Sequence, residues 1–232
     1  PPPPFFFSNP HPAPPILSGL VGSEMCIRDR LNIKKASDTE RDGVRMAAYD
    51  FDSQAGIRLR MHVVYKVGLV KGATVHMQVL NTSQAEDMAG QLEFGAGHPG
   101  VYITLSPRGI GLTKLTQNEK HITQTRRRFM LLGQTLAGQQ VWDVRRCIRA
   151  LRTLERCASA PLELWGTGDS ASLITLATLF ERDIHKIHLV DYPSTDKEQP
   201  DYLNISRFTT PPQLINLVKR KTEVVILGKE KK

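Results

Sequence analysis

Alternating hydrophobic and polar positions mark the first predicted strands of the chain. Arg45–Asp52 and Ile57–Val67 both alternate with a period of two residues, and Ser53–Gly56 between them has the composition of a turn. The pattern predicts an antiparallel hairpin with one face exposed to water. Apolar runs at Thr74–Leu80 and Val101–Leu105 predict two further short strands.

Helical periodicity is clearest in the middle of the chain. Arg126–Glu155 predicts a long helix with an apolar stripe, which Gly133 and Gly138 are expected to break near its start. A shorter helix is predicted at Ser83–Phe94, followed by a glycine-rich loop over Gly95–Gly100.

The last third of the chain alternates strands with helices. Leu162–Phe180 contains a short apolar strand, a glycine turn and a helix rich in small and apolar residues. His185–Tyr192 predicts the next strand, Pro211–Arg220 a helix and Thr222–Leu227 the last strand. An antiparallel start followed by strand–helix units predicts an α/β fold whose sheet becomes parallel.

The glycine turn supports three interpretations. In a nucleophile elbow, G-x-S-x-G, Gly166 takes the first position, Gly168 stands where the serine belongs and Ser170 where the second glycine belongs. In a dinucleotide-binding motif, G-x-G-x-x-G/A, the fitting residues are Gly166, Gly168 and Ala171. Asp191 then ends the next strand at roughly the distance of a ribose-binding acid. In the third interpretation, the glycines only let the helix pack closely on the strand.

The position of the turn in the chain favours the elbow. A dinucleotide-binding domain usually begins with its glycine turn and needs several strand–helix units after it. Only about 60 residues with two predicted strands follow here. An α/β-hydrolase sheet instead has several strands before the elbow, the first of them antiparallel. We therefore expect an incomplete α/β-hydrolase-type sheet, with a Rossmann-like nucleotide-binding domain as the alternative.

Residues 1–30 do not read as part of a folded domain. They begin with four prolines and three phenylalanines and lack the consecutive basic, apolar and small-residue regions of a signal peptide. Val21–Arg30 resembles the translation of a sequencing adapter. We expect a disordered, non-native leader over 1–30 and a partial α/β-hydrolase domain over 31–232. The true amino terminus is then missing, and the sequence indicates no compartment.

The net charge of +8 belongs to residues 31–232, because the leader holds equal numbers of acids and bases. Apart from clusters at Arg126–Arg128, Lys219–Lys221 and Lys229–Lys232 the basic residues are spread out, and no nucleic-acid-binding motif is present. A solvated basic surface is expected. No apolar run is long enough to span a bilayer, so neither nucleic acid nor a membrane is expected as a partner.

Metal and disulfide chemistry find no support in the sequence. Outside the leader only Cys147 and Cys157 remain, without further Cys or His residues at metal-binding spacing. We expect no metal and no cofactor. Cys147 lies beside the apolar stripe of the long predicted helix and is expected in the core.

Several segments between Gly100 and Val225 carry a family resemblance. They are Arg127–Leu136, Val141–Arg146, Leu164–Ala171, Pro200–Arg207 and Pro212–Gln213. Through them the chain resembles acetyl xylan esterase-like proteins of the α/β-hydrolase fold, a group that includes carbohydrate esterases. The resemblance implies that the parent protein acts on an acylated carbohydrate or another small ester.

The resemblance also implies a catalytic triad that this chain lacks. The family's serine nucleophile corresponds to Gly168, and glycine cannot attack an acyl carbon. The acid is expected after the Thr222–Leu227 strand and the histidine later still, beyond Lys232. We therefore expect an inactive esterase, or a relative that keeps the fold as a non-catalytic ligand-binding module. The oligomeric state is not predicted.

The sequence gives little support to any residue that could replace the missing nucleophile. Ser170 is expected to cap the helix after the turn, and Asp169 is expected at its start, where the helix dipole stabilises a negative charge. Asp191 is the best candidate for a site acid, because open α/β sheets bind ligands at the carboxyl ends of their strands. His62 and His76 lie within predicted strands, where packing or surface roles are expected. His185 and His188 have no visible Ser or Cys partner, and nothing specific indicates a function for His98 and His121 in their loops.

Two further expectations concern stability. Asp143 and Arg146 lie one helical turn apart and are expected to form an ion pair on the helix surface. If the last strand and helix of the fold are missing, the sheet ends in an open apolar edge, and the chain is expected to be poorly soluble.

Overall fold

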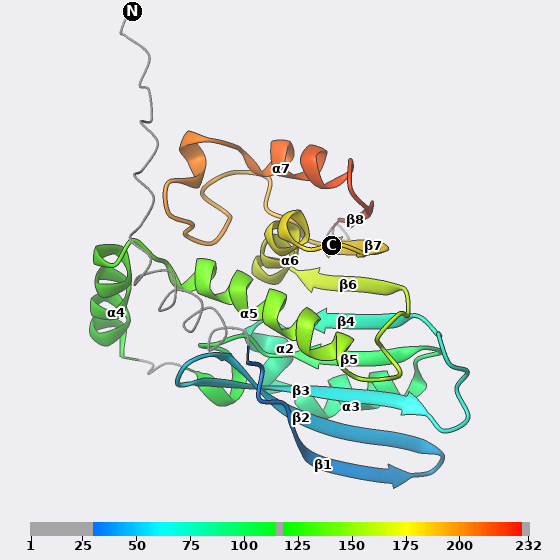
Figure 1. Ribbon diagram of the computed structural model, residues 1–232. Coiled ribbons are helices and arrows are strands. Elements are labelled where there is room, and N and C mark those ends of the chain that lie inside the picture. The colour runs from blue at the N-terminus through cyan, green and yellow to red at the C-terminus, as the bar shows by residue number, and fades with distance from the viewer. Residues whose placement is uncertain (1–29, 115–117, 229–232) are drawn as a thin grey trace, which may run out of the picture. The chain divides into compact units, whose positions relative to one another are not determined.

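The computed structural model describes residues 30–114 and 118–228 (Figure 1). From Leu31 onward the described residues form one compact unit. The predicted leader, apart from Arg30, and the Lys229–Lys232 tail lie outside the described residues, so their nature stays a prediction.

One eight-stranded sheet organises this unit, in the order β1-β2-β3-β5-β4-β6-β7-β8. The first three strands and β5 pair antiparallel, and the pairs from β5 onward are parallel. The predicted fold class is therefore confirmed. The strands are β1 (Lys34–Arg41), β2 (Val44–Gln54), β3 (Ile57–Lys66), β4 (Val75–Val79), β5 (Val101–Leu105), β6 (Leu162–Thr167), β7 (Lys186–Val190) and β8 (Glu223–Leu227).

The predicted hairpin is β2 and β3, but the sequence did not predict β1. Every residue of β1 is exposed, and its sequence KKASDTER alternates no apolar positions. A strand that buries no side chain leaves no period-two signal, and backbone pairing to β2 together with the exposed Arg45–Asp38 ion pair fixes its place.

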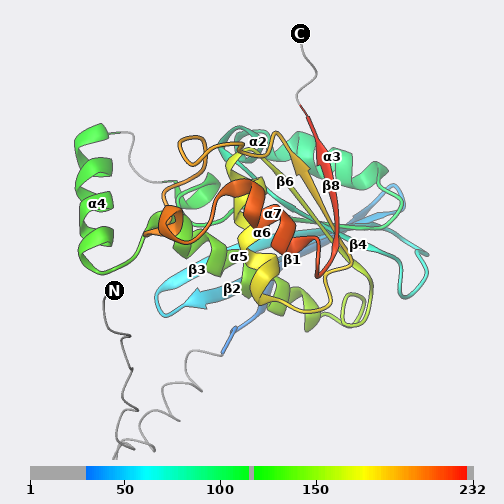
Figure 2. The ribbon, with the colours of Figure 1, turned by 90° about the horizontal axis from the view of Figure 1, so that it is seen from above.

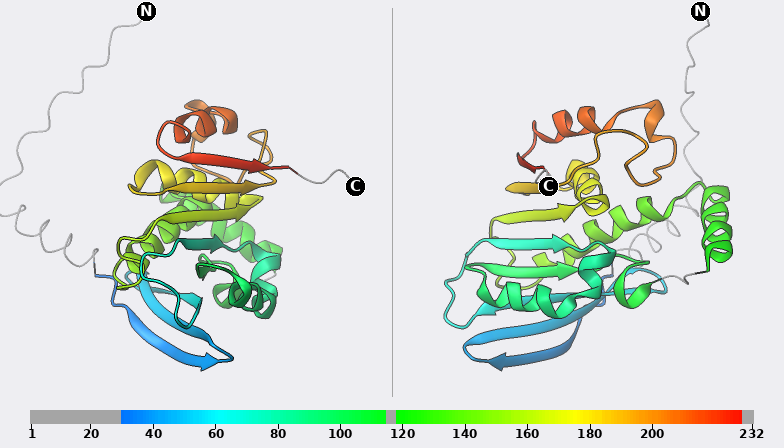
Figure 3. Two further views of the ribbon diagram at one scale, coloured as in Figure 1. Left: turned by 90° about the vertical axis from the view of Figure 1, so that its right-hand side faces the viewer. Right: turned by 180° about the vertical axis from the view of Figure 1, so that it is seen from behind.

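Helices cover the two faces of the sheet, as Figures 2 and 3 show. On one face lie α2 and α3, and on the other lie α5, α6 and α7. The last of these begins at two prolines with a capping box formed by Thr210 and Gln213. The helices are α2 (Thr82–Glu86), α3 (Met88–Gly97), α4 (Glu119–Leu131), α5 (Leu136–Arg152), α6 (Asp169–Phe180) and α7 (Pro211–Val218).

Both predicted helices in the middle of the chain divide into two. The first breaks at Asp87, whose carboxylate accepts a hydrogen bond from Gly90 N and starts α3, which extends into the predicted glycine-rich loop. The second breaks at Gly133, which adopts φ +67°, a conformation that favours glycine. Thr135 then caps α5 by accepting from Gly138 N, so Gly138 lies inside the helix rather than at the break.

The interior contains a buried ion pair that corrects one prediction. Asp143 is fully buried rather than on the helix surface, and Arg108, in the loop after β5, donates Nη2 to Asp143 Oδ1 (2.6 Å) and Nε to Oδ2 (2.9 Å). Arg146 is also buried, at 1% exposure, and donates to the Asp52 carbonyl. The surface-pair expectation was wrong because the polar side of α5 faces the hairpin, where Ser53 also donates to Asp143.

Candidate functional site

The turn between β6 and α6 has the backbone of a nucleophile elbow. Gly168 is the N-cap of α6 with φ 60° and ψ −119°, a region that residues with side chains enter only under strain. Its N–H donates to the carbonyl of Val190 at the end of β7 (2.9 Å), which fixes the turn to the neighbouring strand. The position where the elbow motif places a nucleophile is thus built, but it holds glycine.

The two glycines of the turn serve different purposes. A Cβ atom added to Gly166 would lie 2.7 Å from Ala171 N and from the Ser170 carbonyl group, so this glycine lets α6 pack against β6. A Cβ atom added to Gly168 would meet nothing within 4 Å. Close packing therefore accounts for Gly166, whereas Gly168 leaves open space at the tip of the elbow.

The hydroxyl of Ser170 is engaged within the turn, although the residue borders the cavity described below. It is buried, its Oγ accepts from Thr167 N (2.8 Å) and donates to Thr167 O (3.0 Å), and it lies inside the first turn of α6. Gly168, not Ser170, occupies the N-cap position that the sequence suggested for the serine. The hydroxyl of Ser170 closes the turn instead of capping the helix.

The two candidate acids lie at the carboxyl ends of neighbouring strands. Asp169 is exposed at the start of α6, where partial burial raises the pKa of its carboxyl group. Asp191 follows β7 with φ +50°, and its N–H donates to Leu227 O (3.0 Å). Its Oδ1 is buried and has no hydrogen-bond partner among the described residues. Asp169 borders the cavity described next, and Asp191 does not.

A cavity of about 300 Å³ opens beside the elbow. Its walls come from the carboxyl ends of three parallel strands, through Thr82 after β4, Ile110 after β5 and Asp169 after β6. Ile122 and Phe129 of α4 form the opposite wall. This is the edge of an open α/β sheet at which ligands bind.

The electrostatics of the cavity combine a helix end with an ion pair. The first turn of α6 presents backbone N–H groups and the positive end of the helix dipole, which favour an oxygen-rich or partly negative ligand group. Arg126 of α4 forms an ion pair with Asp201, in the loop between β7 and α7, and both residues line the cavity. That pair connects two segments far apart in the sequence across the cavity.

No histidine among the described residues lines this cavity. His76 and His188 belong to another cluster, in which Glu163 Oε2 lies 3.4 Å from His76 Nδ1 and 3.0 Å from His188 Nε2. Trp165 stacks on His188 with ring centroids 3.7 Å apart. Because side chains alternate along β6, Glu163 and Trp165 point to the face opposite the one that Gly166 presents to α6. The cluster and the elbow therefore lie on different faces.

Among residues 30–114 and 118–228, no group of three or more His, Cys, Asp or Glu side chains is arranged to hold a metal ion. The two cysteines are buried and unpaired, and burial raises the pKa of both thiols, that of Cys157 to about 11.

Comparisons with known proteins complete the description of the site. No family model matches the sequence, and no curated protein matches it significantly. A solved structure from Bacteroides fragilis, assigned as an acetyl xylan esterase, superposes with a TM-score of 0.71 at 9% identity, covering 93% of this chain and 74% of that chain. Acetyl xylan esterase 1 from Thermoanaerobacterium sp. gives 0.61 at 11% identity, covering 95% and 90%. The chain has the α/β-hydrolase fold.

A glucuronoyl esterase from Solibacter usitatus is also similar, with a TM-score of 0.62 at 10% identity over 88% of this chain and 69% of that chain. Likeness at such identities shows the fold alone. The resemblance predicted from the sequence is thus confirmed as a structural similarity to acetyl xylan esterases and related carbohydrate esterases. The chain thus combines an esterase-like fold with a glycine, Gly168, at the tip of the turn after β6.

The sequence located the elbow but not the cavity. Gly166, Gly168, Asp169 and Ser170 were singled out from the motif alone. The wall formed by α4 was missed, because nothing in its sequence indicates that Ile122 and Phe129 turn toward the elbow. The Arg126–Asp201 pair joins residues 75 positions apart, and sequence alone offers no signal for such a contact.

Proposed function

We propose that this chain binds a small ester, of which an acylated carbohydrate is the leading example, at the elbow cavity without cleaving the ester bond. The observation that carries the proposal is the elbow backbone of Gly168 beside a cavity of about 300 Å³. A strand-to-helix turn of this kind suits the presentation of a group to an ester, and Gly168 offers no side chain that could react.

The lining of the cavity supports an acyl ligand. Apolar side chains of α4 and α6, namely Ile122, Phe129 and Leu173, suit an acyl group or the apolar face of a sugar ring. Thr82 and Gln140 supply polar groups for hydroxyl oxygens. The N–H groups at the start of α6 suit an ester carbonyl oxygen, as they would in an oxyanion hole.

The solved structures with this fold support the same ligand class. The similar proteins include acetyl xylan esterases and a glucuronoyl esterase, whose names refer to acylated or esterified carbohydrates. The alternative of a Rossmann-like domain gains less support, because the glycine motif of that domain lies in its first strand–helix turn. Gly166 and Gly168 follow β6 instead, which comes after the parallel strands β4 and β5 in the chain.

The test is to titrate the full chain with acetylated xylobiose and with deacetylated xylobiose, using calorimetry. We expect saturable binding of the acetylated sugar, weaker binding of the deacetylated one, and no release of acetate over hours. Thr125→Trp should abolish binding, because Thr125 lines the cavity and the larger side chain fills it. Thr123→Trp is the matched control, since Thr123 is exposed on the same helix and does not line the cavity.

Each outcome bears on a separate part of the proposal. Absence of binding, or equal binding by both Trp variants, would overturn the assignment of the cavity. Release of acetate in repeated turnovers by the unmodified chain would overturn the non-hydrolytic role and show that the chain is an active esterase.

A further inference from the structure

The carboxyl-terminal end of α4 exposes three consecutive large apolar side chains. Met130, Leu131 and Leu132 have 48%, 87% and 73% of their surface exposed. Ile122 and Phe129, on the inner side of the same helix, are half-buried and border the cavity. Met130 also borders the cavity. The cavity therefore accounts for the inner side of α4 and part of Met130, whereas no packing in the described part of the chain covers Leu131 and Leu132.

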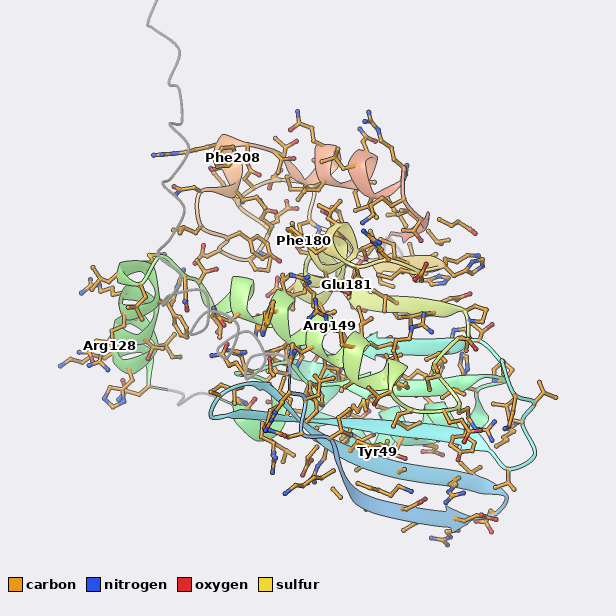
Figure 4. The ribbon with its side chains drawn as sticks, viewed as in Figure 1. Tyr49, Arg128, Arg149, Phe180, Glu181 and Phe208 are labelled. Atoms are coloured by element: carbon orange, nitrogen blue, oxygen red, sulfur yellow. The ribbon has the colours of Figure 1, made fainter. Side chains whose placement is uncertain are left out.

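The same helix end is strongly basic. Arg127 and Arg128 are both exposed, and only Phe129 separates them from Met130. Arg126 is engaged with Asp201, but no ion pair joins Arg127 or Arg128 to an acid of the described residues. Arg128 points away from the sheet in Figure 4. Exposed positive charge thus lies beside exposed apolar surface over one helical turn.

We propose that Arg127–Leu132, the basic tip of α4, docks on the surface of an anionic lipid bilayer. Leucine and methionine side chains enter the boundary between headgroups and acyl chains, while arginines pair with lipid phosphates. Charge complementarity selects an anionic surface. Leu131 and Leu132 protrude from the helix end, and a bilayer accommodates protruding apolar side chains without a matching pocket.

The contact is peripheral. None of the described helices is long and apolar enough to cross a membrane. The proposal departs from the sequence-based expectation of no membrane partner, which rested on the lack of a spanning segment and did not consider a helix end. Because α4 also forms one wall of the cavity, docking brings the ligand site close to the lipid surface.

The test is flotation of the full chain with two kinds of vesicle, phosphatidylcholine alone and phosphatidylcholine mixed with phosphatidylserine. We expect flotation with the mixed vesicles only, and loss of it at high salt, since salt screens the arginines. The double variants Leu131→Ser/Leu132→Ser and Arg127→Gln/Arg128→Gln should each reduce the bound fraction at least several-fold. Both change exposed side chains, and unchanged thermal melts would confirm that the variants fold.

Matched controls separate docking from adsorption by net charge. Lys219→Gln/Arg220→Gln removes the same charge from the exposed end of α7, and Leu112→Ser removes a side chain that is 85% exposed elsewhere. Both should bind like the unmodified chain. The proposal is overturned if the unmodified chain does not float with the mixed vesicles, or if the α7 variant loses as much binding as the α4 variants. Self-association that only the α4 variants abolish, without vesicle binding, would assign the tip to a second copy and also overturn it.

Discussion

Arg108 and Asp143 form a two-point ion pair inside the protein, with Arg108 Nη2 and Nε donating to the two carboxylate oxygens at 2.6 and 2.9 Å. The backbone N–H of Arg108 donates to the same carboxylate at 2.9 Å. Asp143 is fully buried and Arg108 is 7% exposed. The pair fixes the loop after β5, which supplies one wall of the cavity, to the middle of α5.

Asp143→Ala is expected to destabilise the fold by about 3–5 kcal/mol, because it leaves the Arg108 guanidinium buried without its counter-ion. Urea unfolding followed by circular dichroism measures the change. The control is Glu155→Gln, which breaks the exposed Lys71–Glu155 pair and should leave the midpoint unchanged. Equal midpoints for the two variants would contradict the prediction.

The glycines of the elbow should respond differently to alanine. Gly166→Ala forces a Cβ atom to within 2.7 Å of the backbone of α6, so the helix must move and the variant should lose most of its stability. Gly168→Ala meets open space and suffers only from its backbone conformation, at a cost of about 1–3 kcal/mol. Thermal melts of both variants check this order, and a less stable Gly168 variant would reverse it.

Acidification should weaken the fold before its carboxylates titrate. Burial, opposed in part by Glu163, lowers the pKa of His76 from 6.5 to about 4, so the folded state keeps this histidine neutral while the unfolded chain takes up a proton. The pKa values of His62 and His98 are also lowered by burial. Stability is then full above pH 6.5 and falls as the pH drops toward 4, by at most about 1.4 kcal/mol per pH unit for each histidine.

Urea midpoints at pH 7, 6 and 5 measure that slope. His76→Gln should flatten it between pH 6.5 and 5, where Asp and Glu side chains contribute little. A slope that His76→Gln leaves unchanged would show that other groups carry the dependence.

The two described cysteines should be unreactive in the folded chain. Both are buried, and burial raises the pKa of each thiol, which disfavours the reactive thiolate. In a Cys26→Ser variant, which removes the thiol of the leader, we expect no reaction with Ellman's reagent at pH 8 until denaturant is added. Stoichiometric labelling of the native variant would contradict this burial.

The two outer strands of the sheet differ in their protection against aggregation. β1 presents charged and polar side chains along its length, whereas β8 exposes Ile226 (49%) and Leu227 (42%). We expect the chain to be poorly soluble and Ile226→Lys to increase its soluble yield. Val70→Lys, at a position 71% exposed in a loop, is the control and should not help. A cooperative, monomeric melt of unmodified residues 31–232 would contradict the prediction.

The sequence predicted those elements whose apolar side chains recur with the period of a strand or a helix. It did not predict features that depend on contacts between residues far apart in the chain. The elbow was found because Gly166 and Gly168 interrupt an apolar strand. Asp143 was misplaced because its partner, Arg108, comes from a distant loop, and helical spacing indicated Arg146 instead. The cluster of His76, Glu163 and His188 was missed for the same reason, because its three residues come from three separate strands, β4, β6 and β7.

The order of the strands has a consequence for how the chain is made. β4 lies between β5 and β6, yet Leu162–Thr167 leaves the ribosome long after Val101–Leu105. During that interval one edge of β4 has no partner, although Val75, Met77 and Val79 are completely buried in the finished sheet. Synthesis therefore passes through a stage in which the future centre of the sheet is an open apolar edge, and this stage is where a nascent chain is most exposed to misassembly.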